Sequence, residues 1–286
     1  MHQFHDALVS FAERREISMM ILVVSFGTSY PDSLDNAIGA VENAIREFFP
    51  EDKVGRAFTS QVILRILKKR DNMEIDYVKD ALDRALSEDI REMVIQPTHL
   101  MDGLEYMKLM GVVEDYRQQF ERMVVAKPLL MDESDFDAVA SILVDKTAMY
   151  DDGETAICFM GHGTEAKSNE IYRKLQEKFS EMGRENYYIG TVEAEPSLDE
   201  VISLLHGAGI YKKVLLEPLM LVSGDHARHD MAGDQEDSWK RRLAGEGYDV
   251  TCILEGIGQI PEIQQLYVKH TGEAVKRLKN VEEVRG

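Results

Sequence analysis

The chain has few cysteines, with only Cys158 and Cys252 among its 286 residues. Each lies in an apolar run, where a thiol is usually buried as a small hydrophobic side chain. The pair provides neither a disulfide framework nor a CxxC metal motif. The composition therefore excludes a disulfide-stabilised secreted domain, and we expect the protein to be cytoplasmic.

Long apolar runs are also absent. The longest, around 19–26, falls far short of the roughly 18 to 20 residues that span a bilayer, so no membrane partner is expected. The chain begins without the basic start and apolar centre of a secretory signal, and Asp6, Glu13 and Glu16 interrupt it. Apolar residues fall on one helical face of 1–19, which predicts a helical extension that packs on the body or on a second subunit. A homo-oligomer is thus left open.

Basic residues are outnumbered, with 33 Lys and Arg against 52 Asp and Glu and a net charge of −19. Such a surface repels phosphate backbones, so nucleic acid is not an expected partner. The fingerprints GxGxxG, Walker lysine-serine and GxSxG are missing as well. Nucleotide binding and serine-hydrolase chemistry are therefore disfavoured.

The sequence does contain a regular alternation of strand-like and helical segments. The strand-like runs lie at 21–26, 54–60, 93–96, 123–129, 155–160, 187–193, 213–217 and 249–254. Such alternation predicts an α/β fold with parallel sheets. Four strands fall on either side of a helix near 135–149. We therefore predict two similar domains, each a four-stranded parallel sheet flanked by helices: an N-terminal domain at 20–134, then a linker helix and second domain at 135–286.

The two halves of the chain resemble each other at three matched places. The matched segments are VVSFGTS (23–29) with CFMGHGT (158–164), AFTS (57–60) with GTVE (190–193), and MVIQPTHLMDGLE (93–105) with VLLEPLMLVSGDH (214–226). The corresponding residues are Phe26 and His162, Ser60 and Glu193, and Glu105 and His226. Duplication of one α/β unit explains this pattern, and so do two unrelated units that obey the same strand-to-loop chemistry.

His162, Glu193 and His226 each stand at the end of a predicted strand. Because the carboxyl ends of parallel strands meet at one edge of a sheet, we expect the three to converge. Two imidazoles and a carboxylate suit a divalent transition metal and leave coordination positions open. Each residue alone is more often structural, such as a histidine bonded to nearby backbone. Together they favour a site that handles a metal.

Neighbouring residues offer alternatives to this set. Asp225 and His229, or His226 and Asp230, are spaced by one helical turn, so a separate metal site is open. The plainer interpretation has Asp225 capping a helix and His229 facing solvent. Glu195 lies two residues beyond the glutamate of the predicted set and could substitute for it.

Six motifs, taken in order, resemble the anaerobic (class II) sirohydrochlorin cobaltochelatases of cobalamin biosynthesis, of the CbiK type. They are SFGTS, AFTS, QPTHLMDGLEY, MGHGT, GTVEAEP and EPLMLVSGDHARHDMAGD, and the resemblance runs from about Met20 to the C-terminus. That family is similar in fold to the protoporphyrin ferrochelatases, with two α/β domains and a tetrapyrrole cleft between them. The resemblance implies a metal chelatase, a lyase, that inserts cobalt(II) as a co-substrate into sirohydrochlorin or its precorrin form. Two protons are released, and no prosthetic group is implied.

The resemblance also implies roles for the three strand-end residues. His162 of MGHG, Glu193 of GxVE and His226 of GDH would bind the metal, and His162 would take the pyrrole protons, with Glu193 as the second catalytic residue. The same ligands suit iron(II) and nickel(II). A chelatase for those ions, or a tetrapyrrole or metal carrier without turnover, therefore stays open.

Turns of the first half supply candidates for binding the substrate. Small side chains and backbone donors could meet its carboxylates at Thr28, Ser29, Ser60 and His99. A polycarboxylate also calls for local basic groups in so acidic a protein. Candidates are Arg56, Arg65, Lys68, Lys69 and Arg70, although such a run is typical of a solvated helix face.

Overall fold

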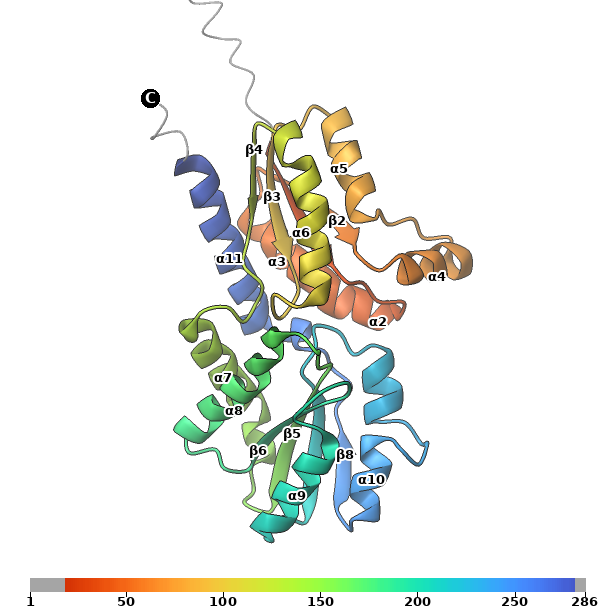
Figure 1. Ribbon diagram of the computed structural model, residues 1–286, viewed down its shortest axis with the longest axis vertical. Coiled ribbons are helices and arrows are strands. Elements are labelled where there is room, and N and C mark those ends of the chain that lie inside the picture. Colours follow the sequence, from red (N-terminus) through yellow and green to blue (C-terminus); the bar gives the residue numbers. More distant parts are fainter. Residues whose placement is uncertain (1–18, 281–286) are drawn as a thin grey trace, which may run out of the picture.

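The structure is a computed structural model that describes residues 19–280 as two α/β halves, one above the other (Figure 1). The first half contains β1 (Met19–Ser25), α2 (Pro31–Ser33), η1 (Leu34–Gly39), α3 (Ala40–Phe48), β2 (Lys53–Phe58), α4 (Gln61–Asp71), α5 (Val78–Ser87), β3 (Glu92–Pro97), α6 (Leu104–Tyr116), η2 (Arg117–Gln119) and β4 (Arg122–Val125). Then follow α7 (Glu133–Thr147), η3 (Ala148–Tyr150), β5 (Thr155–Gly161), η4 (Lys167–Asn169), α8 (Glu170–Glu181), β6 (Tyr187–Thr191), α9 (Leu198–Ala208), β7 (Lys213–Pro218), η5 (Ala227–Met231), α10 (Trp239–Gly245), β8 (Asp249–Cys252), η6 (Ile257–Gln259) and α11 (Pro261–Asn280). The extension predicted at 1–19 lies outside the described residues except for Met19. Among the helices described, none combines the length and apolar character required to cross a bilayer.

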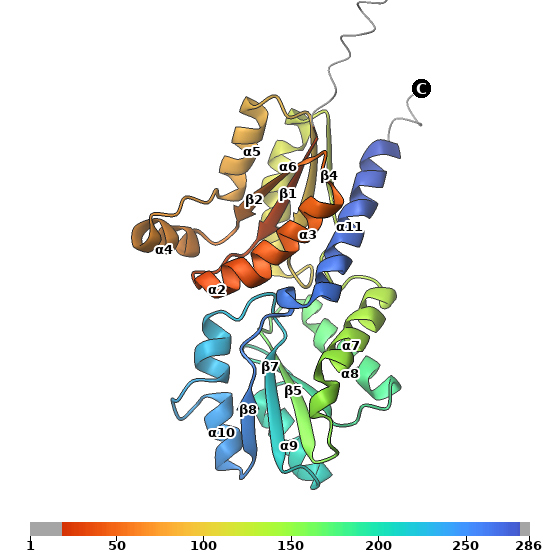
Figure 2. The same ribbon diagram turned by 180° about the vertical axis from the view of Figure 1, so that it is seen from behind.

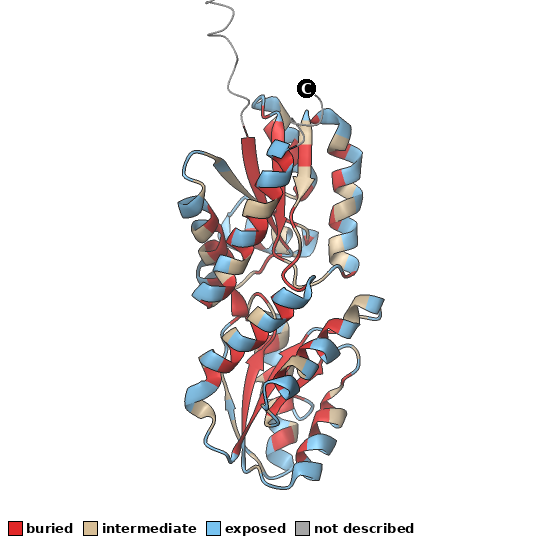
Figure 3. Ribbon diagram, turned by 90° about the vertical axis from the view of Figure 1, so that its left-hand side faces the viewer, coloured by how far each residue is buried: buried red, intermediate tan, exposed pale blue. Residues whose placement is uncertain are grey.

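Each half is built on one parallel sheet of four strands. The strand order is β2-β1-β3-β4 in the first sheet and β6-β5-β7-β8 in the second. The first strand of each sheet along the chain, β1 (MMILVVS) or β5 (TAICFMG), is an inner strand and is buried along its whole length (Figure 3). Continuous apolar strands of this kind arise because helices cover both faces of a parallel sheet. The predicted fold class, two similar four-stranded parallel sheets, is confirmed.

The helix that follows the last strand of each sheet packs on the other half of the molecule. Helix α7 follows β4 but lies against α8 of the second half, while α11 follows β8 and η6 but packs on α3, β3 and β4 (Figures 1 and 2). The predicted boundaries placed all of 135–286 in the second domain. Its last helix instead makes these contacts with the first sheet, so the chain crosses between the halves twice.

Alternation along the central strands divides the core. Ile21 of β1 and Phe159 of β5 belong to one hydrophobic cluster that extends through both halves and includes Leu278 of α11. Leu22 and Cys158, one residue away on each strand, face two separate clusters, each confined to one half. Because side chains alternate between the faces of a strand, one face of each sheet joins the halves and the other closes its own half.

Buried polar contacts fix α11 in place. The Tyr267 hydroxyl donates to the Thr98 carbonyl at 2.8 Å, just beyond β3. The Thr271 hydroxyl donates to Gln96 Oε1, also at 2.8 Å, within β3. Since a buried polar group costs free energy unless it is paired, these contacts favour one position of the helix along the sheet.

A buried histidine connects the two crossing helices. His270 of α11 lies with its Nε2 3.1 Å from Asp135 Oδ1 of α7, and the side chains are only 1% and 2% exposed. The other carboxylate oxygen of Asp135 accepts the backbone N–H of Asp132, which caps the start of α7. The Asp135 carboxylate thus stabilises the start of α7 and also connects α7 to α11.

The backbone hydrogen bonds of the two halves follow the correspondence read from the sequence. Ser60 N–H donates to the carbonyl of Phe26 at 3.1 Å, and Glu193 N–H donates to the carbonyl of His162 at 2.9 Å. Thr98 N–H bonds to the carbonyl of Val24 in the same way that Leu219 N–H bonds to that of Met160, at 2.9 and 2.8 Å. The two sheets therefore match residue by residue at their carboxyl edges.

We expect His270→Leu to lower the free energy of unfolding by about 2 to 4 kcal/mol, because it leaves the Asp135 carboxylate buried with one donor fewer. Urea titration followed by circular dichroism measures the change. His206→Leu is the matched control, since His206 pairs with Glu246 at 3.3 Å where the side chains are 50% and 44% exposed. Equal effects of the two substitutions would contradict a structural role for the buried contact.

Candidate metal centre

The first predicted ligand, His162, directly follows the central strand of the second sheet. Gly161 ends that strand against the Tyr172 ring, and a Cβ atom at this position would collide with the ring. Gly163 has a φ of +84°, in the left-handed region that favours glycine. The two glycines therefore let the chain turn sharply at the edge of the sheet and present the imidazole there.

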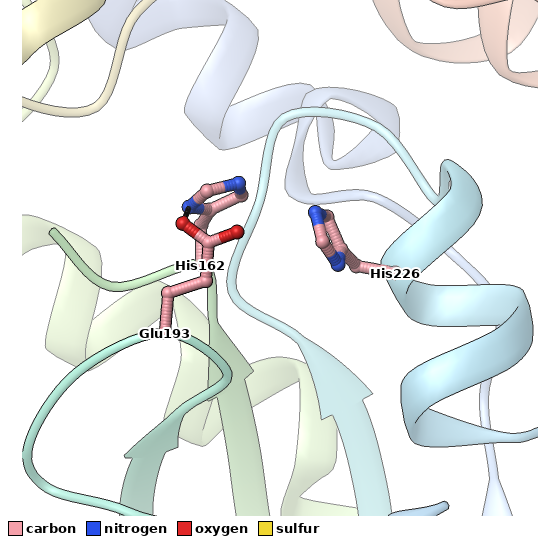
Figure 4. A group of neighbouring side chains, drawn as sticks. All are labelled: His162, Glu193 and His226. Carbon is pink, nitrogen blue, oxygen red and sulfur yellow. Dashed lines mark ion pairs between the residues drawn. The ribbon is translucent and has the colours of Figure 1, made fainter.

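The structure brings His162, Glu193 and His226 together (Figure 4). Each residue offers one ligand atom, and these three atoms all lie within 4.8 Å of one another. Among the described residues, these three side chains form the cluster that could hold a metal ion. His162 Nδ1 is 3.5 Å from Glu193 Oε2, and the two imidazole centroids are 4.6 Å apart at 87°. Glu193 follows β6 and His226 precedes η5, so each comes from a different strand end. The predicted convergence is present, while the roles of these residues stay predictions.

Each imidazole has an acceptor next to its Nδ1 atom. His162 Nδ1 lies 2.9 Å from the Gly163 carbonyl, and His226 Nδ1 lies 2.5 Å from Asp230 Oδ2. Because a carbonyl or carboxylate oxygen accepts, both contacts favour the tautomer with hydrogen on Nδ1. The Nε2 lone pairs then remain for a metal or a proton.

The three side chains are open to solvent. His162 is 47% exposed, Glu193 54% and His226 34%. A divalent ion can therefore reach them, and three protein donors leave coordination positions for other ligands. This openness differs from a closed structural site, which surrounds its ion with protein.

The alternative ligands make other contacts. Asp225 and His229 pair at 3.0 Å on the surface, and Asp230 bonds to His226 as described. Among residues 19–280, neither pair forms a group of three potential metal ligands with another residue. Glu195 Oε2 accepts the Ser197 N–H at 2.8 Å and is not a member of the central group.

The first half contacts the segment that carries His226. The Tyr30 hydroxyl donates to Asp225 Oδ1 at 3.1 Å. Arg228 forms an ion pair with Asp32, and its guanidinium lies 4.3 Å from the centre of the Tyr30 ring. Burial, and then the hydrogen bond to Asp225, raises the pKa of Tyr30 above its ordinary value. Sequence reasoning missed this contact, because Tyr30 carries no motif.

The candidates for substrate binding in the first half have several structural tasks. Thr28 is buried and its hydroxyl accepts the Tyr30 N–H, while Ser60 caps α4. The Ser29 carbonyl accepts a hydrogen bond from Arg70. These contacts are all within the chain, and a binding role stays a prediction for each residue.

The imidazole of His99 is enclosed. Within residues 19–280 neither ring nitrogen has a hydrogen-bond partner, and the ring packs edge-on against Tyr106 with centroids 6.3 Å apart. Burial lowers the pKa of His99 to about 4, against an opposing effect of Glu105. In this conformation the ring nitrogens do not reach a substrate, and the predicted binding role of His99 finds no support in its contacts.

Most of the candidate basic side chains already have partners. Arg56 forms two hydrogen bonds of 2.7 Å with buried Glu42. The α4 residues contact their own neighbourhood: Arg65 the Gln61 carbonyl, Lys68 the Glu74 carboxylate and Arg70 the Asp71 carboxylate. The basic side chains of α4 therefore lie largely on a solvent-exposed helix face.

Comparison with known proteins assigns the family. The model of the cobalt chelatase family CbiK matches residues 19–276. The chain is 36% identical to a sirohydrochlorin cobaltochelatase of Salmonella typhimurium over 255 residues, which cover 89% of this chain and 96% of the relative. This chain belongs to the CbiK family of cobalt chelatases.

Other relatives agree with the family and with the fold. Sirohydrochlorin cobaltochelatase CbiKC of Nitratidesulfovibrio vulgaris is 30% identical, with coverage of 90% of this chain and 91% of the relative. Among solved structures, SirB from Bacillus subtilis with Fe3+ has a TM-score of 0.63 at 15% identity, with coverage of 93% and 98%. CbiX, the terminal enzyme of siroheme biosynthesis in denitrifying bacteria, has a TM-score of 0.53 at 13% identity, with coverage of 90% and 99%. The two structures support the fold alone.

For this CbiK family member we expect Asp230→Ala to weaken cobalt(II) binding by about 10- to 100-fold, because the carboxylate orients the His226 ring. Titration against a competing chelator measures the affinity. Asp234→Ala is the control, since the Asp234 side chain is 94% exposed and pairs with Lys240, away from the three predicted ligands. An unchanged affinity in Asp230→Ala would show that Asp230 does not support His226.

Burial of His99 predicts a pH dependence of stability. Between pH about 6.5 and about 4 the unfolded chain binds a proton at His99 that the folded chain does not bind, so stability falls as the pH falls. The difference in pKa corresponds to about 3 kcal/mol over this window. Urea titrations at several pH values measure the free energy of unfolding. Over this window the free energy of unfolding of His99→Leu should fall by about 3 kcal/mol less than that of the wild type. If the free energies of unfolding of the wild type and of His99→Leu fall equally with pH, the buried, neutral state of His99 is contradicted.

Proposed function

We propose that the protein is a sirohydrochlorin cobaltochelatase that inserts cobalt(II) into sirohydrochlorin. The observation that carries this proposal is membership of the CbiK family, with a relative of that named activity aligned along nearly its whole length. The convergence of His162, Glu193 and His226 supports it from the chemistry of the residues. Cobalt is a substrate in this reaction and not a resident cofactor.

The reaction exchanges two pyrrole N–H protons for one divalent cation, so charge is balanced when both protons leave. The protein must hold the ion without enclosing it, and must accept protons beside it. Two neutral imidazoles and one carboxylate meet the first requirement, because the ring nitrogens of the substrate can take the remaining positions. The exposure of all three side chains meets the need for water to leave.

We assign the proton acceptor to His162 Nε2. With hydrogen on Nδ1, which faces the Gly163 carbonyl, His162 has one lone pair, on Nε2. That lone pair would hold the ion first and would accept a proton once the ring nitrogens of the substrate have taken the ion. Glu193, 3.5 Å from Nδ1, stabilises the imidazolium that forms. Because nearly half of the imidazole is exposed, each proton can pass on to solvent before the next transfer.

Cobalt is inferred from the names of the relatives and not from the ligands. Two histidines and a glutamate accept cobalt(II), iron(II) and nickel(II) alike. Anaerobic assays with each ion in turn, followed by absorbance of sirohydrochlorin, compare the three. Insertion of iron or nickel but not cobalt would contradict the proposed metal.

We expect His162→Ala to reduce the insertion rate by at least about 100-fold while metal-free sirohydrochlorin still binds, because the variant lacks a ligand and a proton acceptor. The assay uses excess sirohydrochlorin and cobalt(II), so that turnover beyond one equivalent distinguishes an enzyme from a carrier. His206→Ala changes a half-exposed histidine elsewhere in the second half and should keep full activity. Retained activity in His162→Ala would refute the assignment.

A further inference from the structure

The loops that carry His162 and Glu193 are supported by the start of α8. We refer to residues 162–166, between β5 and η4, and residues 192–196, after β6, as the two ligand loops. A side chain on a loop is placed no more accurately than the loop backbone, and loops are usually the more mobile parts of a fold. Ligands that stand on loops therefore depend on contacts that fix the backbone beneath them.

One side-chain amide joins the two ligand loops. Asn169, the last residue of η4, accepts the Thr164 N–H on its Oδ1 at 3.0 Å, and its Nδ2 donates to the Glu195 carbonyl. An amide makes both bonds because it carries an acceptor and a donor. Thr164 stands two residues after His162, and Glu195 stands two residues after Glu193. The amide therefore fixes each loop close to its predicted ligand.

The hydroxyl of Tyr172, one turn further along the chain in α8, contacts the first ligand loop. It accepts the Gly163 N–H at 3.3 Å, and Tyr172 is only 1% exposed. A Cβ atom on Gly161 would lie 2.2 Å from the ring, so the chain just before His162 lies directly on the aromatic side chain. Burial raises the pKa of the Tyr172 hydroxyl, and hydrogen bonds from the backbone of Gly163 and His162 oppose this effect. Tyr172 therefore fixes the backbone on both sides of His162.

The two ligand loops also pack directly on each other. A Cβ atom on Gly163 would lie 2.8 Å from Thr191 Oγ1 and 2.9 Å from the Ala194 nitrogen. The Thr191 hydroxyl donates to the Ala194 carbonyl at 2.5 Å, and the Glu193 N–H donates to the His162 carbonyl at 2.9 Å. Because close-packed groups transmit displacement, a shift of one loop also shifts the other.

We propose that Asn169 and Tyr172 are positioning residues that set the separation of His162 and Glu193, and with it the affinity and the coordination geometry of the bound metal. This inference rests on the proposed function, which makes the two residues metal ligands. Asn169 and Tyr172 act through the backbone of the ligand loops. His226 comes from a different loop, after β7, so this support acts on two of the three ligands.

The test removes the hydrogen-bonding groups and keeps the approximate shape of each side chain, with Asn169→Leu and Tyr172→Phe. We expect each to weaken cobalt(II) binding about tenfold, because residues that orient metal ligands from behind have effects of this size. Titration against a competing chelator measures the affinity without sirohydrochlorin. The visible absorption of bound cobalt(II), which depends on the number and arrangement of its ligands, should change as well. Affinity for metal-free sirohydrochlorin should stay unchanged.

The same helix provides a matched control for the amide. Gln176, seven residues after Asn169, accepts the Ile189 N–H at 2.9 Å and donates to the Tyr187 carbonyl at 2.7 Å. Its amide makes the same two kinds of contact, but on the edge strand β6 instead of the ligand loops. Gln176→Met should therefore leave the cobalt(II) affinity and the absorption of the bound ion as in the wild type.

Tyr187→Phe is the matched control for the hydroxyl. Tyr187 is buried, and its hydroxyl lies 2.8 Å from Thr147 Oγ1 of α7. Urea titration of all four variants measures the free energy of unfolding, so a loss of stability is distinguished from a loss of metal affinity. If Asn169→Leu does not fold, Tyr172→Phe, which keeps the whole ring, carries the test.

The outcomes separate this inference from the proposed function. Wild-type turnover with unchanged cobalt(II) affinity and absorption in Asn169→Leu and Tyr172→Phe overturns the inference and leaves the function standing. Weaker cobalt(II) binding in these two variants but not in the controls, without turnover in the wild type, supports the inference and refutes the function. Equal losses of affinity in the controls overturn the inference, because the effect would then follow general stability and not the ligand loops.

Discussion

The packing of α11 against the first sheet brings the two halves together, and the contacts of the first half beside the candidate metal centre depend on this arrangement. Tyr267 and Thr271 anchor the helix to the end of β3, while His270 connects it to α7. Strands in both sheets are parallel, so each sheet has a single carboxyl edge where loops can carry functional side chains. When α11 brings those edges to one boundary, residues from the first half can contact the segment that holds His226. The contact between Tyr30 and Asp225 is the direct result.

Orientation of the two imidazoles matters as much as their proximity. An acceptor beside each Nδ1 leaves both Nε2 lone pairs available, although the two acceptors differ: a carbonyl for His162 and a carboxylate for His226. A hydrogen bond to a charged carboxylate is stronger than one to a neutral carbonyl, so the orientation of His226 is held more firmly than that of His162. Under the proposed function, His226 is the more firmly oriented ligand, and His162 is the ring assigned to exchange protons. Such a division suits a reaction in which a metal arrives as protons leave.

Local patterns in the sequence predicted the sheets well. The apolar runs of β1 and β5 are buried along their length, and His162 directly follows β5, at a strand end as the sequence predicted. The destination of α11 could not be predicted, because its amphipathic pattern shows a buried face but not which sheet covers it. The bidentate partner of Arg56 is likewise set by packing, since Glu42 lies on a neighbouring helix.

The candidate site shows the same limit. One-turn spacing between His226 and Asp230 was visible in the sequence, and it left open a separate metal site. Which role Asp230 has depends on whether a third ligand stands nearby, and that is a property of the folded chain. Enclosure of His99 by Tyr106 was equally hidden. Sequence reasoning thus finds residues capable of chemistry, while burial decides which of them are available for it.

The two halves share one backbone design at their carboxyl edges but place different side chains there. The three predicted donors stand on the second edge, whereas the corresponding positions of the first edge hold Phe26, Ser60 and Glu105. A repeated α/β unit can therefore keep its backbone while one copy alone acquires donors suited to a metal. Parallel strands end at the same edge in both halves, so the side chains that follow them decide which edge can hold an ion.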